Sequence, residues 1–180
     1  MKRNHYLHGE QVYLRAVEPE DLEFLYKLEN DPDLWNVGNF IVPYSRYAIK
    51  QFIEQTKNDL FADTQLRLMI VRTADDTVMG VADLCNFQPK HSHAEVGIAL
   101  QQGFCGAGHG REALHLLCHY AFGFLNLHQL TAHVLVDNTV SRHLFTSCGF
   151  VECGLLRQWA SVGDRYEDVV LMQRLNAPIS

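Results

Sequence analysis

The spacing of apolar residues along the chain alternates between a strand period and a helical period. Residues 10–17 alternate polar and apolar positions, which predicts a strand. Residues 22–30 repeat apolar side chains at helical spacing, so a helix is expected there, ended by Asp31 and Pro32. An irregular apolar stretch follows, and a second helix is predicted to begin after Ser45, whose side chain can cap it.

From residue 66 the pattern becomes typical of β-structure. Residues 66–73, 77–87 and 93–101 are rich in branched and apolar side chains and are separated by short polar turns, which predicts a meander of three antiparallel strands. The segment 97–110 then holds five of the 12 glycines and leads directly into an apolar helical pattern at 111–125. Strand, glycine-rich loop and helix, in this order, form the most specific local pattern of the chain.

The last third of the chain predicts a strand, a helix and a hairpin. Residues 130–137 form the strand, Asn138 is placed to cap a helix at 140–148, and residues 150–175 predict two strands around a turn at Gly163 and Asp164. No repeat, linker or low-complexity segment is visible. We therefore expect one domain over residues 1–180, of the α+β class.

Charge and cysteine content favour some classes of protein and disfavour others. With 15 Lys and Arg against 21 Asp and Glu, the formal charge is −6, so no nucleic-acid partner is expected. No apolar run approaches the ~20 residues that span a bilayer, so no membrane association is expected. The five cysteines are odd in number and form no CxxC pair, which predicts a reducing compartment and hence the cytoplasm.

The glycine-rich loop places glycines at every second position just before a helix. Gly106, Gly108 and Gly110 leave backbone N–H groups uncovered at the positive end of that helix, an arrangement that binds phosphate groups. The spacing is GxGxG, so it is neither the GxGxxG dinucleotide fingerprint nor a P-loop, which needs GK[ST]. A flexible surface turn remains the alternative.

Three segments of the chain are together typical of one family. They are HAEVGIAL (93–100) with FCGAGHGREAL (104–114), VLVDNTVSRHLFTSCGF (134–150), and the closing segment 151–175. Over residues 10–175 the chain resembles the GNAT family of N-acetyltransferases. The resemblance implies a three-layer α/β/α fold, with a mixed, mostly antiparallel sheet of about seven strands flanked by about four helices. It also implies that acetyl-CoA lies between the strands at 93–101 and 130–137, which splay apart.

The resemblance assigns cofactor contacts to the strand, the loop and the following helix. The implied acetyl-CoA contacts are Val96, Gly97, Ile98, Ala99, Cys105, Gly106, Ala107, Gly108, His109, Gly110, Arg111, Asn138, Ser141 and Phe145. The chain departs from the family at two of these positions. Cys105 stands where the family usually has Gln or Arg, and Phe145 stands where many members have a tyrosine that protonates the leaving thiolate.

Acetyl transfer needs a neutral amine, a donor for the developing oxyanion and a proton for the thiolate. Glu95 is the candidate base, acting directly or through water, with substrate anchoring or a solvent-facing carboxylate as alternatives. Gly97 is expected to mark a β-bulge that turns an N–H of Val96, Gly97 or Ile98 towards the thioester, or else to be a packing glycine. Ser141 is the nearest substitute for the missing tyrosine hydroxyl.

The acceptor amine is left open among a protein N-terminus, a polyamine and a small amine. The subgroup that the chain resembles contains spermidine and ribosomal-protein N-terminal acetyltransferases, and the spermidine enzymes carry acidic residues just before a Pro-Tyr pair. Here Ile41 and Val42 precede that pair. Negative potential is expected instead from four carboxylates, Glu29, Asp31, Asp33 and Glu95. A homo-oligomer is compatible with the sequence.

Other chemistries receive less support from the sequence. His115 and His119, like His91 and His93, have spacings that suit a metal, but no carboxylate or cysteine completes a local ligand set, so no metal is expected. A covalent acetyl intermediate on Cys105 is a minor alternative. A CoA-binding or sensing module with little turnover is the main rival function, suggested by the departures at Cys105 and Phe145.

Overall fold

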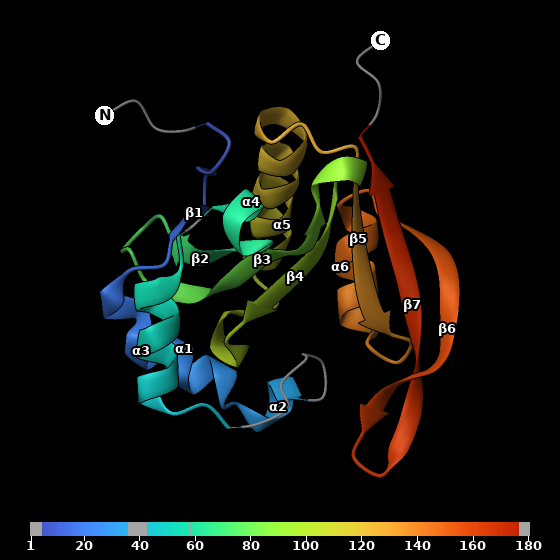
Figure 1. Cartoon of the computed structure of the whole chain (residues 1–180), viewed down its shortest axis with the longest axis horizontal. Helices are drawn as coiled ribbons and strands as arrows, with labels where there is room; N and C mark the ends of the chain where they lie inside the picture. Colours follow the sequence, from blue (N-terminus) through green and yellow to red (C-terminus); the bar gives the residue numbers. More distant parts are fainter. Residues whose placement is uncertain (1–4, 36–42, 58, 177–180) are drawn as a thin grey trace.

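The computed structural model describes residues 5–35, 43–57 and 59–176. Within these residues one seven-stranded sheet forms the centre, in the order β1-β2-β3-β4-β5-β7-β6 (Figure 1). The strands are β1 (Val12–Ala16), β2 (Leu66–Arg72), β3 (Val78–Gln88), β4 (His93–Leu100), β5 (Gln129–Leu135), β6 (Val151–Val162) and β7 (Arg165–Leu175). Neighbouring strands are antiparallel except β4 and β5, which are parallel. The expected meander and the mixed seven-stranded sheet are confirmed.

Helices cover both faces of the sheet and give the three expected layers. The α-helices are α1 (Leu22–Glu29), α2 (Pro32–Trp35), α3 (Arg46–Gln55), α4 (Leu60–Asp63), α5 (His109–His119) and α6 (Thr139–Ser147), and a π-helical turn at Tyr120–Phe124 continues α5. Helices α1 and α3 pack over Met69 and Val81 on one face. Helices α5 and α6 bury Leu117 and Phe145 against the other face. Figure 1 shows α1 and α3 in front of the sheet and α5 behind it.

The predicted helix caps are present, and two short helices were missed. The Ser45 hydroxyl accepts a hydrogen bond from the Ala48 N–H at 3.1 Å, and the Asn138 side chain accepts one from the Ser141 N–H at 3.0 Å. Irregular structure was expected after Pro32, but one helical turn, α2, begins there, and no helix was expected where α4 lies. Proline fixes a backbone angle that suits a first helical position, so Pro32 ends α1 and starts α2.

Strands β4 and β5 separate soon after they pair. Three residue pairs join them, ending at Glu95 and Thr131. Beyond that point β4 continues in register with β3 alone, and β5 with β7 alone. Figure 1 shows the two strands close together at one end and apart at the other. The backbone of β4 from Val96 to Ala99 therefore has no strand partner on its β5 side, and the expected splaying of these strands is confirmed.

The β-bulge expected at Gly97 is not there. Gly97 pairs directly with Asp83, and the register with β3 is unbroken from Glu95 to Leu100. The irregularity of this strand pair lies on β3, between Cys85 and Gln88, where Asn86 has a positive φ of 51°. A side chain at Gly97 would point over Asp83, with its Cβ 3.6 Å from the Asp83 Cβ. The open edge of β4 thus results from the divergence of β5 and not from a bulge.

Candidate active site

The glycine-rich loop has a backbone that requires two of its glycines. Gly106 and Gly108 have φ angles of 81° and 90°, which side chains of L-residues rarely adopt, and Gly108 is the N-cap of α5. A Cβ added at either position would meet no heavy atom of the described residues within 4 Å. The space beside the loop is therefore open, and the first N–H groups of α5 face it without intrahelical partners.

The rest of the loop is held by contacts with the strand and the helices. A Cβ at Gly110 would lie 3.3 Å from a Leu100 methyl group, so this glycine allows close packing of α5 on β4. His109 Nδ1 lies 3.3 Å from the Phe104 carbonyl oxygen, and the Cys105 thiol lies 3.7 Å from the Gln101 carbonyl oxygen. Arg111 is exposed in the first turn of α5. Open N–H groups, positive φ glycines and an adjacent guanidinium fit a bound pyrophosphate.

Glu95 is the last residue of β4 that pairs with β5, and its carboxylate is held by two side chains. Oε1 lies 2.8 Å from His133 Nδ1, and Oε2 accepts a hydrogen bond from Asn86 Nδ2 at 2.9 Å. The side chains of Glu95 and His133 are 20% and 32% exposed. A carboxylate that orients an imidazole in this way leaves the second ring nitrogen, Nε2, able to exchange a proton.

Sequence reasoning missed His133. It lies on β5 two residues beyond Thr131, the partner of Glu95, and therefore points to the same face of the sheet. Its pattern offered a weak signal, because it is a polar residue that alternates with buried Ala132 and Val134. The distance of 38 residues from Glu95 hid the contact, which depends on how the two parallel strands are aligned.

Three implied acetyl-CoA contacts, Asn138, Ser141 and Phe145, belong to α6 or to its cap. Asn138 caps the helix, and Ser141 is half-buried in the first turn. Phe145 is 4% exposed, and its ring packs edge-to-face on Phe150 with ring centres 5.0 Å apart. The structure thus brings Asn138 and Ser141 to the C-terminal end of β5, whereas Phe145 belongs to the core.

The family follows from a comparison with known proteins. A family model described as "Acetyltransferase (GNAT) domain" matches residues 11–151. The chain belongs to the GNAT acetyltransferase family. It is similar to the ribosomal-protein-serine acetyltransferase of Escherichia coli, with 30% identity over 172 residues, 93% of this chain and 94% of the relative.

Solved structures of another GNAT enzyme show the same fold. The crystal structure of spermidine N-acetyltransferase from Vibrio cholerae in complex with CoA and spermine has a TM-score of 0.84 and 30% identity, and covers 93% of this chain and 97% of that chain. A dodecameric structure of spermidine N-acetyltransferase from the same organism has a TM-score of 0.80 and 30% identity, with 93% and 95% covered.

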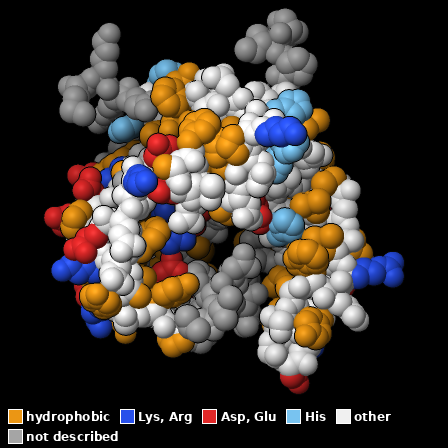
Figure 2. All heavy atoms as spheres, viewed as in Figure 1, with side chains coloured by type: hydrophobic (Ala, Val, Ile, Leu, Met, Phe, Trp, Pro, Cys, Tyr) orange, Lys and Arg blue, Asp and Glu red, His pale blue; other side chains and the backbone are white. Residues whose placement is uncertain are grey.

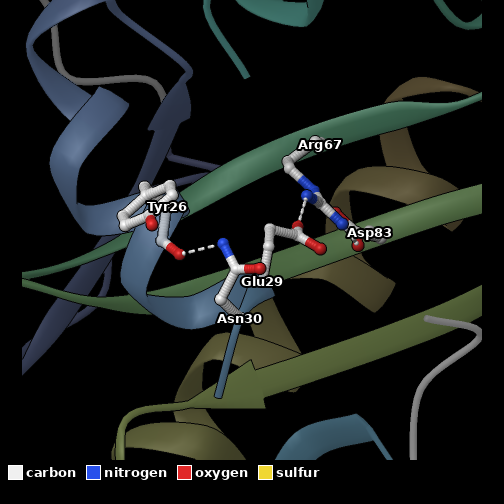
Figure 3. A network of polar contacts seen from close by, with 5 residues as sticks. All are labelled: Tyr26, Glu29, Asn30, Arg67 and Asp83. Atoms are coloured by element: carbon white, nitrogen blue, oxygen red, sulfur yellow. Dashed lines mark hydrogen bonds and ion pairs between the residues drawn. The ribbon is translucent and has the colours of Figure 1, made fainter. Parts of the chain in front are cut away.

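Two of the four carboxylates expected to face an acceptor amine differ in what they do. Glu29 is 5% exposed and forms an ion pair with Arg67 (Figure 3). Arg67 also donates from Nε and Nη2 to the two Asp83 oxygens, at 2.9 and 2.7 Å. Burial by itself would lower the pKa of Arg67, but the charges of Asp83 and Glu29 outweigh it and raise that pKa. Glu29 therefore serves a buried ion network, whereas Glu95 is accessible.

The Asn30 side chain joins the end of α1 to the backbone of Tyr44. Asn30 donates hydrogen bonds to the carbonyl oxygens of Tyr26 and Tyr44 at 2.8 and 2.9 Å, and its own oxygen accepts from the Tyr44 N–H at 2.9 Å. The contact to Tyr26 appears in Figure 3. Ile41 and Val42 lie outside the described residues, as does the side chain of Asp33. The chain that returns at Tyr44 is thus fixed next to the Arg67 network.

Three further observations concern metal binding, the cysteine thiols and membrane-spanning helices. Among the residues that the structure describes, no three His, Cys, Asp or Glu side chains gather closely enough to hold a metal ion. All five cysteines are free, and burial is the largest cause that raises the pKa of the Cys118 thiol to about 12. In the same part of the chain, no helix has the length and apolar character to cross a membrane.

Proposed function

We propose that this protein transfers the acetyl group of acetyl-CoA to a primary amine. The observation that carries the proposal is the divergence of β4 and β5 directly after Glu95, beside the glycine-rich start of α5. This geometry leaves the β4 amides open along a path from the loop to an accessible carboxylate and imidazole. The V. cholerae relative with the same fold is described in complex with CoA and spermine, which supports CoA and an amine as the two substrates.

Acetyl-CoA would be held by main-chain groups at three places. The loop from Cys105 to Gly110, with Arg111, binds the pyrophosphate, and the open edge of Val96, Gly97, Ile98 and Ala99 pairs with the pantetheine amides. Asn138 and Ser141 lie at the sulfur end of this path. Phe145 is buried under it and contributes through packing. Cys105 takes part only through its backbone, because its thiol is turned to the Gln101 carbonyl oxygen.

In the reaction, the neutral amine nitrogen attacks the thioester carbonyl carbon. The C–N bond forms, the C–S bond breaks, and the amides of β4 around Gly97 stabilise the negative oxygen of the tetrahedral intermediate. Before this attack, the Glu95–His133 pair accepts a proton of the arriving ammonium at His133 Nε2, while Glu95 holds the ring. After the attack, the nitrogen loses a second proton and the leaving thiolate gains one, by way of Ser141 or water.

The acceptor is a primary amine of a protein N-terminus, a polyamine or a small molecule. Relatives that act on spermidine and on a ribosomal protein support this range. The accessible Glu95 favours an acceptor that arrives as a cation. A CoA-binding module without turnover is the alternative, and release of free CoA across a panel of amines separates the two. A module would bind CoA and release none in excess of hydrolysis.

A substitution in the loop tests the site of CoA. Gly108→Glu adds a side chain and a negative charge where the pyrophosphate is proposed to lie, so CoA affinity measured by calorimetry should fall at least about tenfold. Gly163→Glu is the matched control, because Gly163 also has a positive φ and open surroundings but lies in the β6–β7 turn. Both variants lose about 1 to 2 kcal/mol of stability through strain. Equal CoA affinities in the two variants would contradict the proposed cradle.

We also propose a cellular setting and an assembly for this protein. Five free cysteines favour a reducing compartment such as the cytoplasm. A homo-oligomer is supported by the dodecameric V. cholerae relative, and residues 1–180 are proposed to act as one domain. Light scattering coupled to size-exclusion chromatography measures the assembly directly, and a monomer at micromolar concentration would reject the oligomer.

A further inference from the structure

The outer strand β6 contains an irregularity that no part of the proposed reaction explains. Leu156 pairs with Val169 and Ala160 pairs with Glu167, so three residues of β6 lie opposite the single residue Asp168. Gln158, in the middle, has a φ of 49°, and its N–H donates a hydrogen bond of 2.7 Å to the Asp168 carboxylate. Bulges of this kind re-aim a side chain, and such a backbone persists only where its surroundings hold it.

The side chain that this bulge re-aims is Trp159. Its ring lies parallel to the His133 ring, with an interplanar angle of 9° and ring centres 6.4 Å apart. Because β7 lies between β5 and β6 in the sheet, the indole must reach across β7 to meet His133. The Trp159 side chain is nevertheless 63% exposed. Figure 2 shows hydrophobic side chains gathered over β6 and β7, beside a hollow in this face of the molecule.

The position of Trp159, exposed on a strained bulge beside the Glu95–His133 pair, suggests that the indole binds a ligand. An exposed tryptophan gains little from its position in the free protein, because most of its apolar surface still faces water. It gains when a ligand covers that surface, and aromatic side chains offer such contact area with little loss of conformational freedom. The His133 ring lies parallel to the indole, so a ligand that covers the exposed part of the indole would lie close to His133.

The charge of the site decides which kind of group the indole accepts. In the proposed reaction His133 receives a proton, and Glu95 balances that single positive charge. A second ammonium group held on the indole would meet carboxylates that already have partners. Glu95 pairs with His133, Glu167 pairs with Arg165, and Asp168 accepts a hydrogen bond from the Gln158 N–H. An apolar group needs no such partner.

We propose that Trp159 is the specificity-determining wall of the acceptor site and selects primary amines that carry an apolar, aromatic or branched aliphatic group next to the amine. Asp168 acts as a positioning residue, since it holds the bulge that directs Trp159. This inference rests on the proposed function for the place of the reacting amine, and it narrows the acceptor to apolar monoamines over polyamines.

Three probe amines test the wall. They are 2-phenylethylamine, 1-aminobutane and 1,4-diaminobutane, of which the last two differ only in a second ammonium group. For the wild type we expect the highest kcat/KM with 2-phenylethylamine. The kcat/KM for 1-aminobutane should exceed that for 1,4-diaminobutane. Trp159→Ala should raise the KM for 2-phenylethylamine about tenfold with a much smaller change in kcat, whereas Trp159→Phe should stay within about threefold of the wild type.

Further variants separate the wall from general effects on the hairpin. Tyr166→Ala is the matched control, because Tyr166 is an aromatic of the same hairpin and is 68% exposed, and it should leave the KM unchanged. Asp168→Ala should raise the KM in the same direction as Trp159→Ala, and Asp168→Asn, which keeps an oxygen for the Gln158 N–H, should restore it. A KM that is unaffected by Trp159→Ala, or a wild type that prefers 1,4-diaminobutane to 1-aminobutane, would overturn the proposal.

A binding measurement keeps this inference separate from the proposed function. Calorimetry of 2-phenylethylamine with the CoA-saturated protein should show binding that Trp159→Ala weakens about tenfold. If amines are turned over but binding is the same in both proteins, the wall is wrong and the acetyltransferase stands. If binding depends on Trp159 but no amine releases CoA, the acetyltransferase is wrong and the wall stands. If the wild type does not bind the amine at all, the wall is wrong.

Discussion

Two polar clusters lie on the same face of the sheet and differ in how far they are closed. In the first, the Arg67 guanidinium is held by Glu29 and by both oxygens of Asp83, and Glu29 is 5% exposed. In the second, Glu95 holds His133 at 2.8 Å, with side chains 20% and 32% exposed. Gly97 lies next to Asp83 and contributes no side chain between the clusters.

The difference shows how one sheet face serves both stability and chemistry. Buried charges are tolerated when every one of them is paired, and removal of one partner leaves an uncompensated charge. The Arg67 cluster meets that condition between α1, β2 and β3, so it fixes the first helix on the sheet. The Glu95 pair lies where β5 has left β4, so its imidazole keeps a side open to a substrate.

Breaking the Glu95–His133 cluster should have the largest of the predicted effects, and the effect should be a loss of activity. Glu95→Gln keeps the shape of the side chain but weakens its hold on a charged imidazole, so kcat/KM should fall about 10²- to 10⁴-fold. The deficit should grow as the pH is lowered, because fewer acceptor amines are then already neutral. For an amine that is already neutral at the assay pH, Glu95→Gln should lower kcat/KM much less.

The matched control for that experiment is Glu152→Gln. Glu152 is also a strand carboxylate in an ion pair, with Arg142 at 2.7 Å, but it lies on the outer strand β6. Its replacement should leave kcat/KM within a few-fold of the wild type. A deficit of Glu95→Gln that does not depend on pH or on the amine would assign Glu95 to substrate anchoring.

Breaking the Arg67 cluster should lower the stability of the protein more than its activity. Arg67→Ala leaves Glu29 and Asp83 without their cation, and the free energy of unfolding should fall by about 3 to 5 kcal/mol. Arg46→Ala removes an exposed pair with Glu23 and should leave the melting temperature nearly unchanged. Chemical denaturation followed by circular dichroism measures both variants. Similar losses in the two would mean that burial adds nothing to the Arg67 network.

Removing the proposed proton donor of the thiolate, Ser141, should have a smaller effect on activity than Glu95→Gln. Ser141→Ala should lower turnover about tenfold if Ser141 supplies the proton. Phe145→Tyr returns a hydroxyl one helical turn away, and in the double variant it should recover part of that loss. Because Phe145 is 4% exposed, the added hydroxyl should also lower stability. Equal rates in the wild type and all three variants would remove both residues from the mechanism.

The smallest predicted effect uses Cys85, which lies between the two clusters on β3. Burial is the largest cause that raises the pKa of its thiol to about 12, and the charges of Glu95 and Asp83 add to it. Glu95→Gln removes one of those charges, so the pKa should fall and more thiolate should be present at a given pH. Alkylation by iodoacetamide at pH 8, followed by mass spectrometry, should speed up a few-fold at Cys85. Cys118, whose neighbours are unchanged, is the internal control.

The local parts of this site could be predicted from the sequence because they depend on short-range chemistry. Ser45 and Asn138 cap the helices that follow them, since a side-chain oxygen reaches an N–H three residues on. Gly106 and Gly108 have the positive φ angles that a turn into α5 needs. The acetyltransferase motifs led to the right family for the same reason, because they lie within continuous segments.

The parts that failed or were missed depend on contacts between distant segments. The sequence cannot show whether a strand glycine bulges, and Gly97 turned out to sit in a regular register opposite Asp83. Glu29 was expected to face the acceptor, but it is taken by Arg67, 38 residues away. Helical periodicity places Glu29 on its helix, and only the packing of that helix on the sheet decides what the carboxylate meets.

The sequence by itself determined all seven strands, the four longer helices with their caps, the glycine loop and the family. Each of these depends on residues within a few positions of one another, where backbone geometry fixes the outcome. The tertiary structure alone decided that His133 meets Glu95 and that Trp159 meets His133. Those contacts depend on how far β5 runs beside β4 and on the three residues of β6 that face Asp168. Side chains alternate between the two faces of a sheet along each strand. A shift of one residue in the pairing register therefore moves a side chain to the other face.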